Sequence, residues 1–264
     1  MTRPGNRDNL CDVIPYHDEN ETQRPAIVTL AIIVACVLTW IFIQGAGAEE
    51  PLARSVCNLG LIPGELTGKL PPGVRFPMGD ELVCLTDSGR QASNVLYSMF
   101  LHGSWMHLIG NMWFLWLFGN NIEDSMTRPR FLVFYLVCGL AAALLQVWAQ
   151  PSSNIPMVGA SGAISGVMGA YLVLFPRVRV YTFVPLIVIM TSVALPAWVM
   201  LLYWAFLQLV GGFGAVGAEG GGVAFWAHVG GFLAGIVLVK LFVRSNRLAE
   251  HTAGRWEPRR VGWQ

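Results

Sequence analysis

Val158-Gly159-Ala160-Ser161-Gly162-Ala163-Ile164-Ser165-Gly166 is the stretch that decides the fold of this chain. It is a run of small residues that opens an apolar segment, with a hydroxyl near its start. Ser161, Ser165 and Gly169 recur every four residues, so they share one face of a helix. In a membrane, such a smooth face lets a second helix pack very close. This pattern fits a packing ridge without chemistry about as well as it fits a reactive serine. The two interpretations can be separated only by the residues that face Ser161.

The composition indicates an integral membrane protein. Of the 264 residues, 54% are hydrophobic and only 12% are charged, whereas a soluble domain carries roughly 25% charged residues. The net charge of +1 indicates no partner, and we expect none among nucleic acids. The five cysteines show no C-x-x-C spacing, so we expect no structural zinc, no other metal and no cofactor.

Six apolar segments predict an all-α, polytopic bundle of six transmembrane helices, since about 20 apolar residues suffice to span a bilayer. Pro25 and Pro196 stand at the start of two of them, where a missing N–H costs nothing. The fourth segment is short, which would leave Ser161 recessed below the membrane surface. The segments are residues 25–44, 102–122, 131–150, 160–175, 196–210 and 224–243.

The six segments form one predicted catalytic domain over residues 25–243. Residues 1–24 are polar and lack the apolar core of a signal peptide, so we expect a solvated cytoplasmic tail. Residues 244–264 are basic and predict a second cytoplasmic tail. Residues 180–194 are expected to form an interfacial or re-entrant segment. The glycine-rich residues 211–222 are expected to form a mobile connection.

Residues 45–98 form a long first loop that we expect to associate with the membrane. Its stretches 59–66 and 95–101 are apolar enough to lie in the interface. Cys57 and Cys84 are the two cysteines of this loop. They could form a disulfide if the loop faces an oxidising compartment, or remain reduced thiols, and the sequence leaves both open.

The distribution of positive charge predicts the orientation. With six spans both termini lie on one side, and that side holds 13 of the 17 lysines and arginines. The positive-inside rule therefore places the termini in the cytoplasm. Ser161, His107 and His228 then lie near the outer face. The absence of an organelle signal favours the bacterial inner membrane.

Three polar side chains stand at membrane depth with Ser161. His107 and Asn111 are one helical turn apart on the second span, and His228 shares a face with Gly231 and Gly235 on the sixth. Such residues usually face a bundle interior or a wet cavity. They could equally form interhelical hydrogen bonds that only hold the bundle together. His102, near a helix start, favours a structural role.

A serine and a histidine on two small-residue faces permit nucleophilic catalysis. A neutral imidazole is the usual base for a serine hydroxyl, so His228 would take the proton of Ser161. The backbone N–H of Ser161, the Asn111 amide and the His107 ring could stabilise an oxyanion. The helices contain no carboxylate at this depth, because Glu219 is in a loop and Asp124 is at the far end, so we expect a dyad.

Three motifs together resemble the rhomboid family of intramembrane serine proteases. They are Gly159-x-Ser161-Gly162, Ala227-His228-x-x-Gly231-x-x-x-Gly235 and His102-x4-His107-x3-Asn111, over residues 25–243. The resemblance implies a rhomboid-like fold and cleavage of a peptide bond in or beside the transmembrane helix of a substrate, in contact with membrane lipid. Ser161 would be the nucleophile and His228 the base, with His107 and Asn111 at the oxyanion and the glycines and His102 in support. It also implies that the fifth span or the loop before the sixth controls substrate access.

The chain departs from the family pattern at three places. Ser93-Asn94 stand near the position of a Trp-Arg pair that some members carry in the first loop. Ser165 stands where some members have an aromatic residue that packs on the base, so what orients His228 is open. Val223 replaces a glycine that often precedes the Ala-His pair.

Two other classes of protein compete with a protease. A catalytically silent rhomboid-like protein could bind or chaperone membrane proteins, although it would be expected to lack Ser161 or His228. A transporter or channel could use His102, His107 and His228 as a proton or metal path. The sequence shows no inverted repeat and no accompanying carboxylate at membrane depth, so a protease is favoured.

Overall fold

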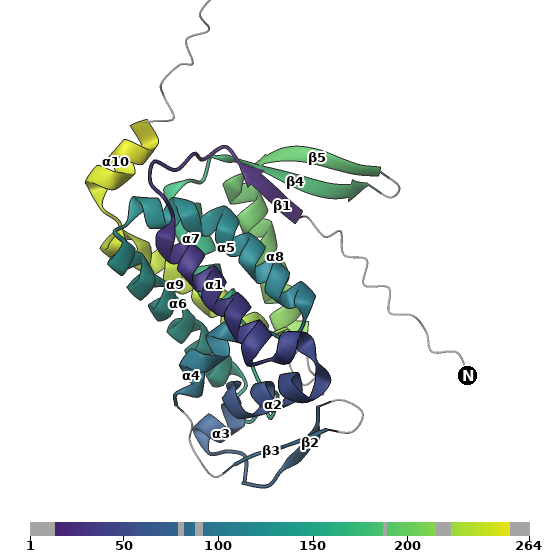
Figure 1. The fold of residues 1–264 in the computed structure, drawn as a ribbon. Helices are drawn as coiled ribbons and strands as arrows, with labels where there is room; N and C mark the ends of the chain where they lie inside the picture. The colour runs from purple at the N-terminus through teal and green to yellow at the C-terminus, as the bar shows by residue number, and fades with distance from the viewer. Residues whose placement is uncertain (1–13, 79–81, 88–91, 187–188, 215–222, 254–264) are drawn as a thin grey trace, which may run out of the picture.

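Six helices of the computed structural model coincide with the six predicted spans (Figure 1). The structure describes residues 14–78, 82–87, 92–186, 189–214 and 223–253. Helices α6, α8 and α9 are long and apolar enough to cross a membrane, and α1 and α7 are shorter apolar helices. The fold is therefore the predicted helical membrane bundle, and the count of six crossings is consistent with it. The helices are α1 (Ile27–Phe42), α5 (Trp105–Ser125), α6 (Arg128–Ala149), α7 (Ser161–Leu174), α8 (Ala197–Gly214) and α9 (Phe225–Phe242).

Local sequence sets where several of these helices begin. The Oγ of Ser104 caps α5 by accepting a hydrogen bond of 3.1 Å from the backbone N–H of His107. Helix α6 carries Pro129 in its first turn, and Pro196 directly precedes α8. Proline suits these positions because the first helical N–H groups have no helical acceptor.

Helix α7 is the buried centre of the bundle, and glycines let α9 pack directly on its backbone. Every residue from 162 to 171 is buried. A Cβ atom added to Gly231 would overlap the carbonyl oxygen of Gly162, and one added to Gly235 would overlap that of Gly166. The two backbones are thus in contact without intervening side chains, as close packing of small residues in membranes allows.

The first loop is folded and lies at the end of the bundle where α7 begins (Figure 1). A disulfide joins Cys57 to Cys84, with the Cα atoms 5.6 Å apart, so the structure favours the bridged alternative. The bridge ties the end of α2 to a two-stranded hairpin. The elements of the loop are α2 (Glu49–Leu59), α3 (Pro63–Thr67), β2 (Arg75–Pro77), β3 (Val83–Leu85), α4 (Asn94–Tyr97) and 3-10 turns at Gly45–Gly47 and Ser98–Phe100.

The segment before α8, expected to be interfacial or re-entrant at residues 180–194, is a β-hairpin, and its place relative to the membrane stays a prediction. Strands β4 (Arg179–Leu186) and β5 (Ile189–Pro196) are antiparallel, and β1 (Ile14–Asp18) pairs with the outer side of β4. The cause is a run of β-branched and aromatic residues that favours strands. Apolar content alone did not predict that this segment forms strands.

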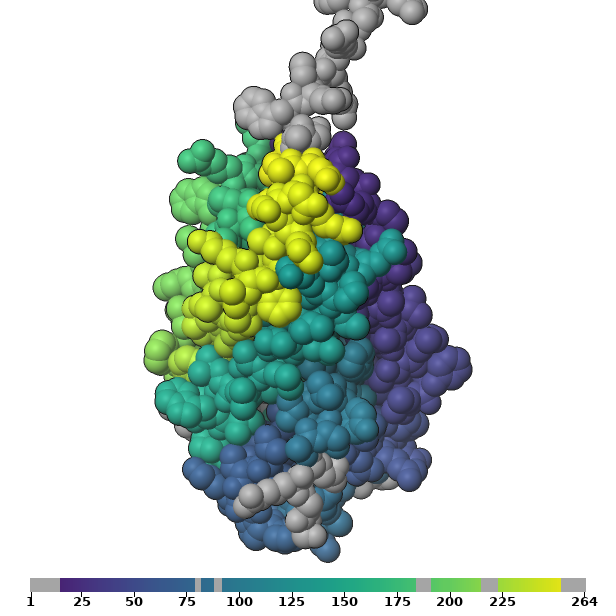
Figure 2. All heavy atoms as spheres, turned by 90° about the vertical axis from the view of Figure 1, so that its left-hand side faces the viewer, coloured from purple at the N-terminus to yellow at the C-terminus, as the bar shows by residue number. Residues whose placement is uncertain are grey.

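The described parts of both terminal segments, residues 14–24 and 245–253, contact the bundle, whereas residues 1–24 were expected to form a solvated tail. Strand β1 belongs to the sheet, and α10 (Ser245–Ala253), yellow in Figure 2, lies across the end of the bundle beside the purple N-terminal segment. The buried His251 Nδ1 lies 2.6 Å from Asp124 Oδ2 of α5. The cytoplasmic placement of these segments and the limits of the predicted domain stay predictions. The expected mobile connection falls largely on residues 215–222, which lie outside the described residues.

A second polar contact ties the N-terminal segment to the core. Asp18 is buried, and its Oδ2 accepts hydrogen bonds from the Tyr171 hydroxyl at 2.6 Å and the Asn121 amide at 3.0 Å. Burial raises the pKa of Asp18, and the Tyr171 hydrogen bond partly offsets that effect. Because Tyr171 belongs to α7, the terminal segment is bonded to the central helix of the bundle.

We expect Gly235→Ala to destabilise the protein, because the added methyl group would overlap the Gly166 carbonyl oxygen. Overpacking of this kind costs about 1–3 kcal/mol. Gly110→Ala is the matched control, since a Cβ added there meets nothing within 4 Å. Thermal unfolding in detergent should show a lower Tm for Gly235→Ala and a Tm for Gly110→Ala at or above that of the wild type. Equal Tm values for the two variants would contradict the close contact of α7 and α9.

Candidate active site

Ser161 is the first residue of α7, and the preceding loop fixes its position. The N–H of Gly159 donates to the carbonyl oxygen of Ser98 at 2.8 Å, and Met157 pairs with Leu61 of the first loop. Gly159 has φ = +125°, a conformation that residues with a side chain rarely adopt. The small residue at 159 is therefore needed for the turn that delivers the serine to the helix start.

His228 of α9 lies directly opposite Ser161. The distance between its Nε2 and the Ser161 Oγ is 2.7 Å, which is a hydrogen bond. The pair meets because Gly231, one turn further along α9, lets that helix approach the Gly162 carbonyl. Gly162 is in turn close to α6, because a Cβ added there would lie 2.6 Å from the Cβ of Ala142.

Gln208 of α8 supplies the third member of this arrangement. Its Oε1 lies 2.7 Å from Nδ1 of His228. If the amide oxygen accepts from Nδ1–H, the lone pair of Nε2 is left facing the serine hydroxyl. The ring of Trp204, one turn earlier on α8, lies 5.9 Å from the imidazole centroid.

Sequence reasoning missed Gln208, although one signal was available. Gln208 is the one strongly polar residue of an otherwise apolar helix, and polar residues at membrane depth usually have a polar partner. The position of that partner on another helix could not be read from spacing. Ser165 stands where some members of the family have an aromatic residue that packs on the base. In this protein Gln208 and Trp204 contact His228 instead. Ser165 itself donates to the Ser161 carbonyl oxygen at 2.6 Å.

His107 and Asn111 lie against the loop just before Ser161. A Cβ added to Gly159 would come within 2.8 Å of His107 Nε2 and 3.6 Å of Asn111 Nδ2. His107 Nδ1 accepts from the Gly103 N–H at 3.3 Å. Asn111 is 7% exposed, and its amide nitrogen has no hydrogen-bond partner among the described residues. A donor of this kind is available to a bound group.

His102 is fully buried beside this cluster but does not reach Ser161. Its backbone N–H donates to Gln44 Oε1 at 2.8 Å, and its carbonyl oxygen accepts from Gln44 Nε2 at 2.7 Å. Its ring packs edge-on against the ring of His107, with the centroids 5.2 Å apart. These contacts link the segment that follows α1 to the segment that precedes α5, and they support the ring of His107.

The cluster opens into a cavity of about 570 Å³ between α5, α7, α8 and α9. Ser161, His228, His107 and Asn111 all line it, so the hydroxyl, the imidazole and the free amide face one space. The remaining wall is mostly apolar, as is usual for a site that binds an apolar chain. It includes Met106, Phe114, Met157, Ile164, Met168, Trp204 and Val223.

The structure shows what surrounds Asn94 and Val223, two positions at which the chain departs from the family pattern. Asn94 is buried and donates through Nδ2 to the carbonyl oxygens of Asn58 and Gly60, at 3.0 and 3.1 Å, which anchors the first loop. Val223 lines the cavity at the start of α9. Within the described ranges, no group of three His, Cys, Asp or Glu side chains could hold a metal ion.

The fold and the site together define a class of protein. It is a polytopic helical membrane protein with a serine and a histidine in one cavity. The family profile described as Rhomboid domain matches residues 89–245, more than half of the chain. The chain therefore belongs to the rhomboid family.

Curated relatives agree with this assignment. The chain is 30% identical over 173 residues to "Rhomboid protein 1, mitochondrial" of Saccharomyces cerevisiae, covering 62% of this chain and 46% of that protein. It is 34% identical over 168 residues to "Rhomboid-like protease 5" of Toxoplasma gondii, covering 62% and 17%. It is 29% identical over 153 residues to human "Presenilin-associated rhomboid-like protein, mitochondrial", covering 54% and 36%. The matched parts thus span less than half the length of these relatives.

The family and the apolar helices together identify an integral membrane protein. Two of these relatives carry the word mitochondrial in their names, so the expected bacterial inner membrane has no support among them and stays a prediction.

We expect Gln208→Ala to slow the reaction of Ser161 with a fluorophosphonate by roughly threefold to tenfold, the value of one hydrogen bond. Gln208→Glu would place a carboxylate beside His228 and favour the protonated imidazole, which cannot accept the serine proton. The pH at which the labelling rate is half of its maximum should then be higher than in the wild type. Labelling rates across a pH series measure both effects. Leu209→Ala, on the same helix, is the control, and a purely structural Gln208 would leave the pH profile unmoved.

Proposed function

We propose that the chain is an intramembrane serine endopeptidase. It hydrolyses a peptide bond in or next to the transmembrane helix of a protein substrate, with Ser161 and His228 as a catalytic dyad. The observation that carries this proposal is the 2.7 Å contact between Ser161 Oγ and His228 Nε2 at the wall of a cavity. A hydroxyl paired with an imidazole in this way is the usual arrangement of an activated serine.

In the first step, Ser161 Oγ attacks the carbonyl carbon of the substrate while its proton moves to His228 Nε2. The negative charge then lies on the former carbonyl oxygen. Collapse of this intermediate breaks the C–N bond, and His228 returns the proton to the departing amine. Water then attacks the ester on Ser161 by the same route, which releases the acid and restores the hydroxyl.

The oxyanion would be held by donors that face the cavity. The N–H of Ser161 is at the first helical position, where helix geometry provides no acceptor. The amide nitrogen of Asn111 has no partner among the described residues, and the ring of His107 lies beside it. Donors held in place before the reaction stabilise the developing charge without reorganisation.

Gln208 would act as a positioning residue rather than a catalytic one. Its neutral amide holds the Nδ1–H of His228 and so favours the tautomer in which Nε2 is a base. The amide carries no negative charge, so it would orient the imidazole without stabilising the imidazolium by charge. A carboxylate in a catalytic triad does both.

We further propose that α8 moves to admit the substrate. Its buried residues are only Ala197, Met200, Leu201 and Gly212, so its separation from the bundle exposes little additional surface. Gln208 lies on α8, and displacement of this helix would therefore break its bond to His228. Closure of α8 around a substrate would restore the orientation of the base.

The topology proposed for the protein keeps both termini in the cytoplasm and opens the site toward the opposite face. The positive charge near the termini supports it. The fold also supports it, because β1 and α10 lie at one end of the bundle and the start of α7 lies at the other (Figure 1).

We expect Ser161→Ala and His228→Ala each to lower the cleavage of a single-span model substrate by about 10³-fold or more, because each removes one half of the dyad. Purified variants in detergent, followed by gel and mass spectrometry, measure this. Ser165→Ala, a serine one turn further along α7, is the control and should retain cleavage. A wild-type protein that binds the substrate but neither cleaves it nor reacts with a fluorophosphonate would instead be a silent, binding member of the family.

We expect Asn111→Ala to lower the cleavage rate by about 10²–10³-fold, the usual effect of removing one oxyanion donor. Because the Asn111 amide nitrogen bonds to no described residue, the Tm should stay close to that of the wild type. Cleavage kinetics and thermal unfolding of the same preparation test the two halves. An unchanged rate would exclude Asn111 from the oxyanion site.

A further inference from the structure

At the end of the bundle opposite Ser161, arginines gather around two crossing turns. The turn between α5 and α6 contacts the turn between α9 and α10. Arg130 Nη1 donates to the Phe242 carbonyl oxygen at 3.1 Å, and Arg247 Nη1 donates to the Met126 carbonyl oxygen at 2.7 Å. The Arg244 N–H donates to the Ser125 carbonyl oxygen at 3.0 Å. Arg128, on the same turn as Arg130, is exposed.

These four arginines have no carboxylate partner among the residues that the structure describes. Arg130 and Arg247 each give a side-chain N–H to a neutral carbonyl oxygen, and the side chain of Arg128 makes no hydrogen bond or ion pair within that part of the chain. No ion pair within the described residues therefore engages these guanidinium groups, and their remaining donors are available to an anion.

Two carboxylates lie nearby, but both are occupied by other donors. Glu123 accepts from the N–H groups of Val28 and Thr29 and from the Thr29 hydroxyl, at 2.7–2.9 Å, and so caps the start of α1. Asp124 accepts from Arg24 at 3.1 Å and contacts His251 at 2.6 Å. Arg24 also pairs with Glu250. Glu123 keeps its negative charge because its donors are neutral, so Arg24, Arg128 and Arg247 face two carboxylates in the pocket, an excess of one positive charge. Neither carboxylate forms an ion pair with Arg128 or Arg247.

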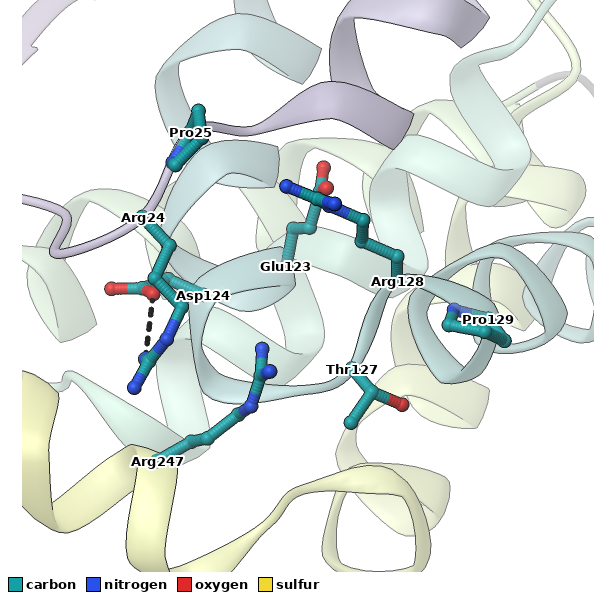
Figure 3. Close-up of a pocket in the computed structure, with 8 residues that line it drawn as sticks. All are labelled: Arg24, Pro25, Glu123, Asp124, Thr127, Arg128, Pro129 and Arg247. Carbon is teal, nitrogen blue, oxygen red and sulfur yellow. Dashed lines mark hydrogen bonds and ion pairs between the residues drawn. The ribbon is translucent and has the colours of Figure 1, made fainter.

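A pocket of about 300 Å³ joins these groups. Figure 3 shows Arg24 at one side, Arg128 and Arg247 at the others, and the start of α6 at Thr127 and Pro129. Thr127 makes no side-chain cap to α6, so the positive end of this 22-residue helix adds to the potential of the guanidinium groups. Guanidinium groups bind phosphate oxygens through paired N–H donors.

We infer that this pocket binds a phosphate group, and that of an anionic membrane phospholipid in particular. The pocket lies at the start of α6. Next to it, the first two turns of α1 and α6 carry four exposed apolar side chains, with exposed fractions of 41–51%: Ile27, Leu30, Leu132 and Val133. An acyl chain attached to a phosphate in the pocket could cover that apolar surface. A free phosphate ion could use the guanidinium groups but not this surface. Basic pockets between membrane helices are known to suit anionic headgroups.

The test uses the purified full-length protein in detergent, with lipid binding followed by native mass spectrometry. The wild type should bind phosphatidylglycerol more tightly than phosphatidylcholine of the same chains. Arg128→Gln should weaken the binding of phosphatidylglycerol by about fivefold, the usual value of one arginine near an anionic surface. Folding should not suffer, because the side chain of Arg128 makes no hydrogen bond or ion pair within the described residues. Arg247→Gln is a second variant, expected to act in the same direction.

The matched control is Arg177→Gln, which removes an exposed arginine elsewhere in the chain, in the turn between α7 and β4. It should change the binding less than twofold. Equal losses of phosphatidylglycerol affinity for Arg128→Gln and Arg177→Gln would indicate diffuse attraction to the surface and would overturn the inference of a site. Equal binding of the two lipids would overturn the inference. Inorganic phosphate is the remaining arm: weak phosphate binding alongside a preference for phosphatidylglycerol supports the lipid, whereas saturable phosphate binding without that preference overturns it.

Discussion

Direct contact between the backbones of α7 and α9 is the constraint on which the rest of this structure depends. Gly231 and Gly235 lie against the carbonyl oxygens of Gly162 and Gly166, so even one methyl group would separate the helices. With little hydrophobic driving force between helices in lipid, such close packing is a principal source of attraction. The same contact brings His228 within 2.7 Å of Ser161. Stability and the geometry of the candidate site therefore have one origin.

The surrounding elements divide into those that fix the serine and those that hold the base. The first loop, closed by the Cys57–Cys84 disulfide, packs against the residues that precede α7 and holds the turn at Gly159. His228 is held on its other side by Gln208, which belongs to α8, a helix with only four buried residues among its 18. If Ser161 and His228 act as proposed, a fixed serine and a histidine held by a loosely packed helix would allow substrate access without disturbing the core.

The opposite end of the bundle has a different character. There β1, α10 and the turns around Ser125 and Arg244 are joined by polar contacts, among them Asp18 with Tyr171 and Asp124 with His251. Tyr171 and Ser161 belong to the same helix, so the N-terminal segment is bonded to the element that carries the proposed nucleophile. The arginines that lack an ion pair at this end, within the described residues, suit an anionic membrane surface.

The sequence alone determined the membrane class, the approximate helices and the pairing of Ser161 with His228. Length, apolarity and small-residue spacing are local quantities, and helix geometry converts them directly into faces and depths. The tertiary structure alone decided the contact of Gln208 with His228, the hairpin at β4 and β5, and the docking of β1 and α10. Each of these joins residues far apart in the chain, such as Gln208 with His228 or Asp18 with Tyr171. Their partners depend on how helices and strands are arranged in space, and spacing along a chain does not contain that information.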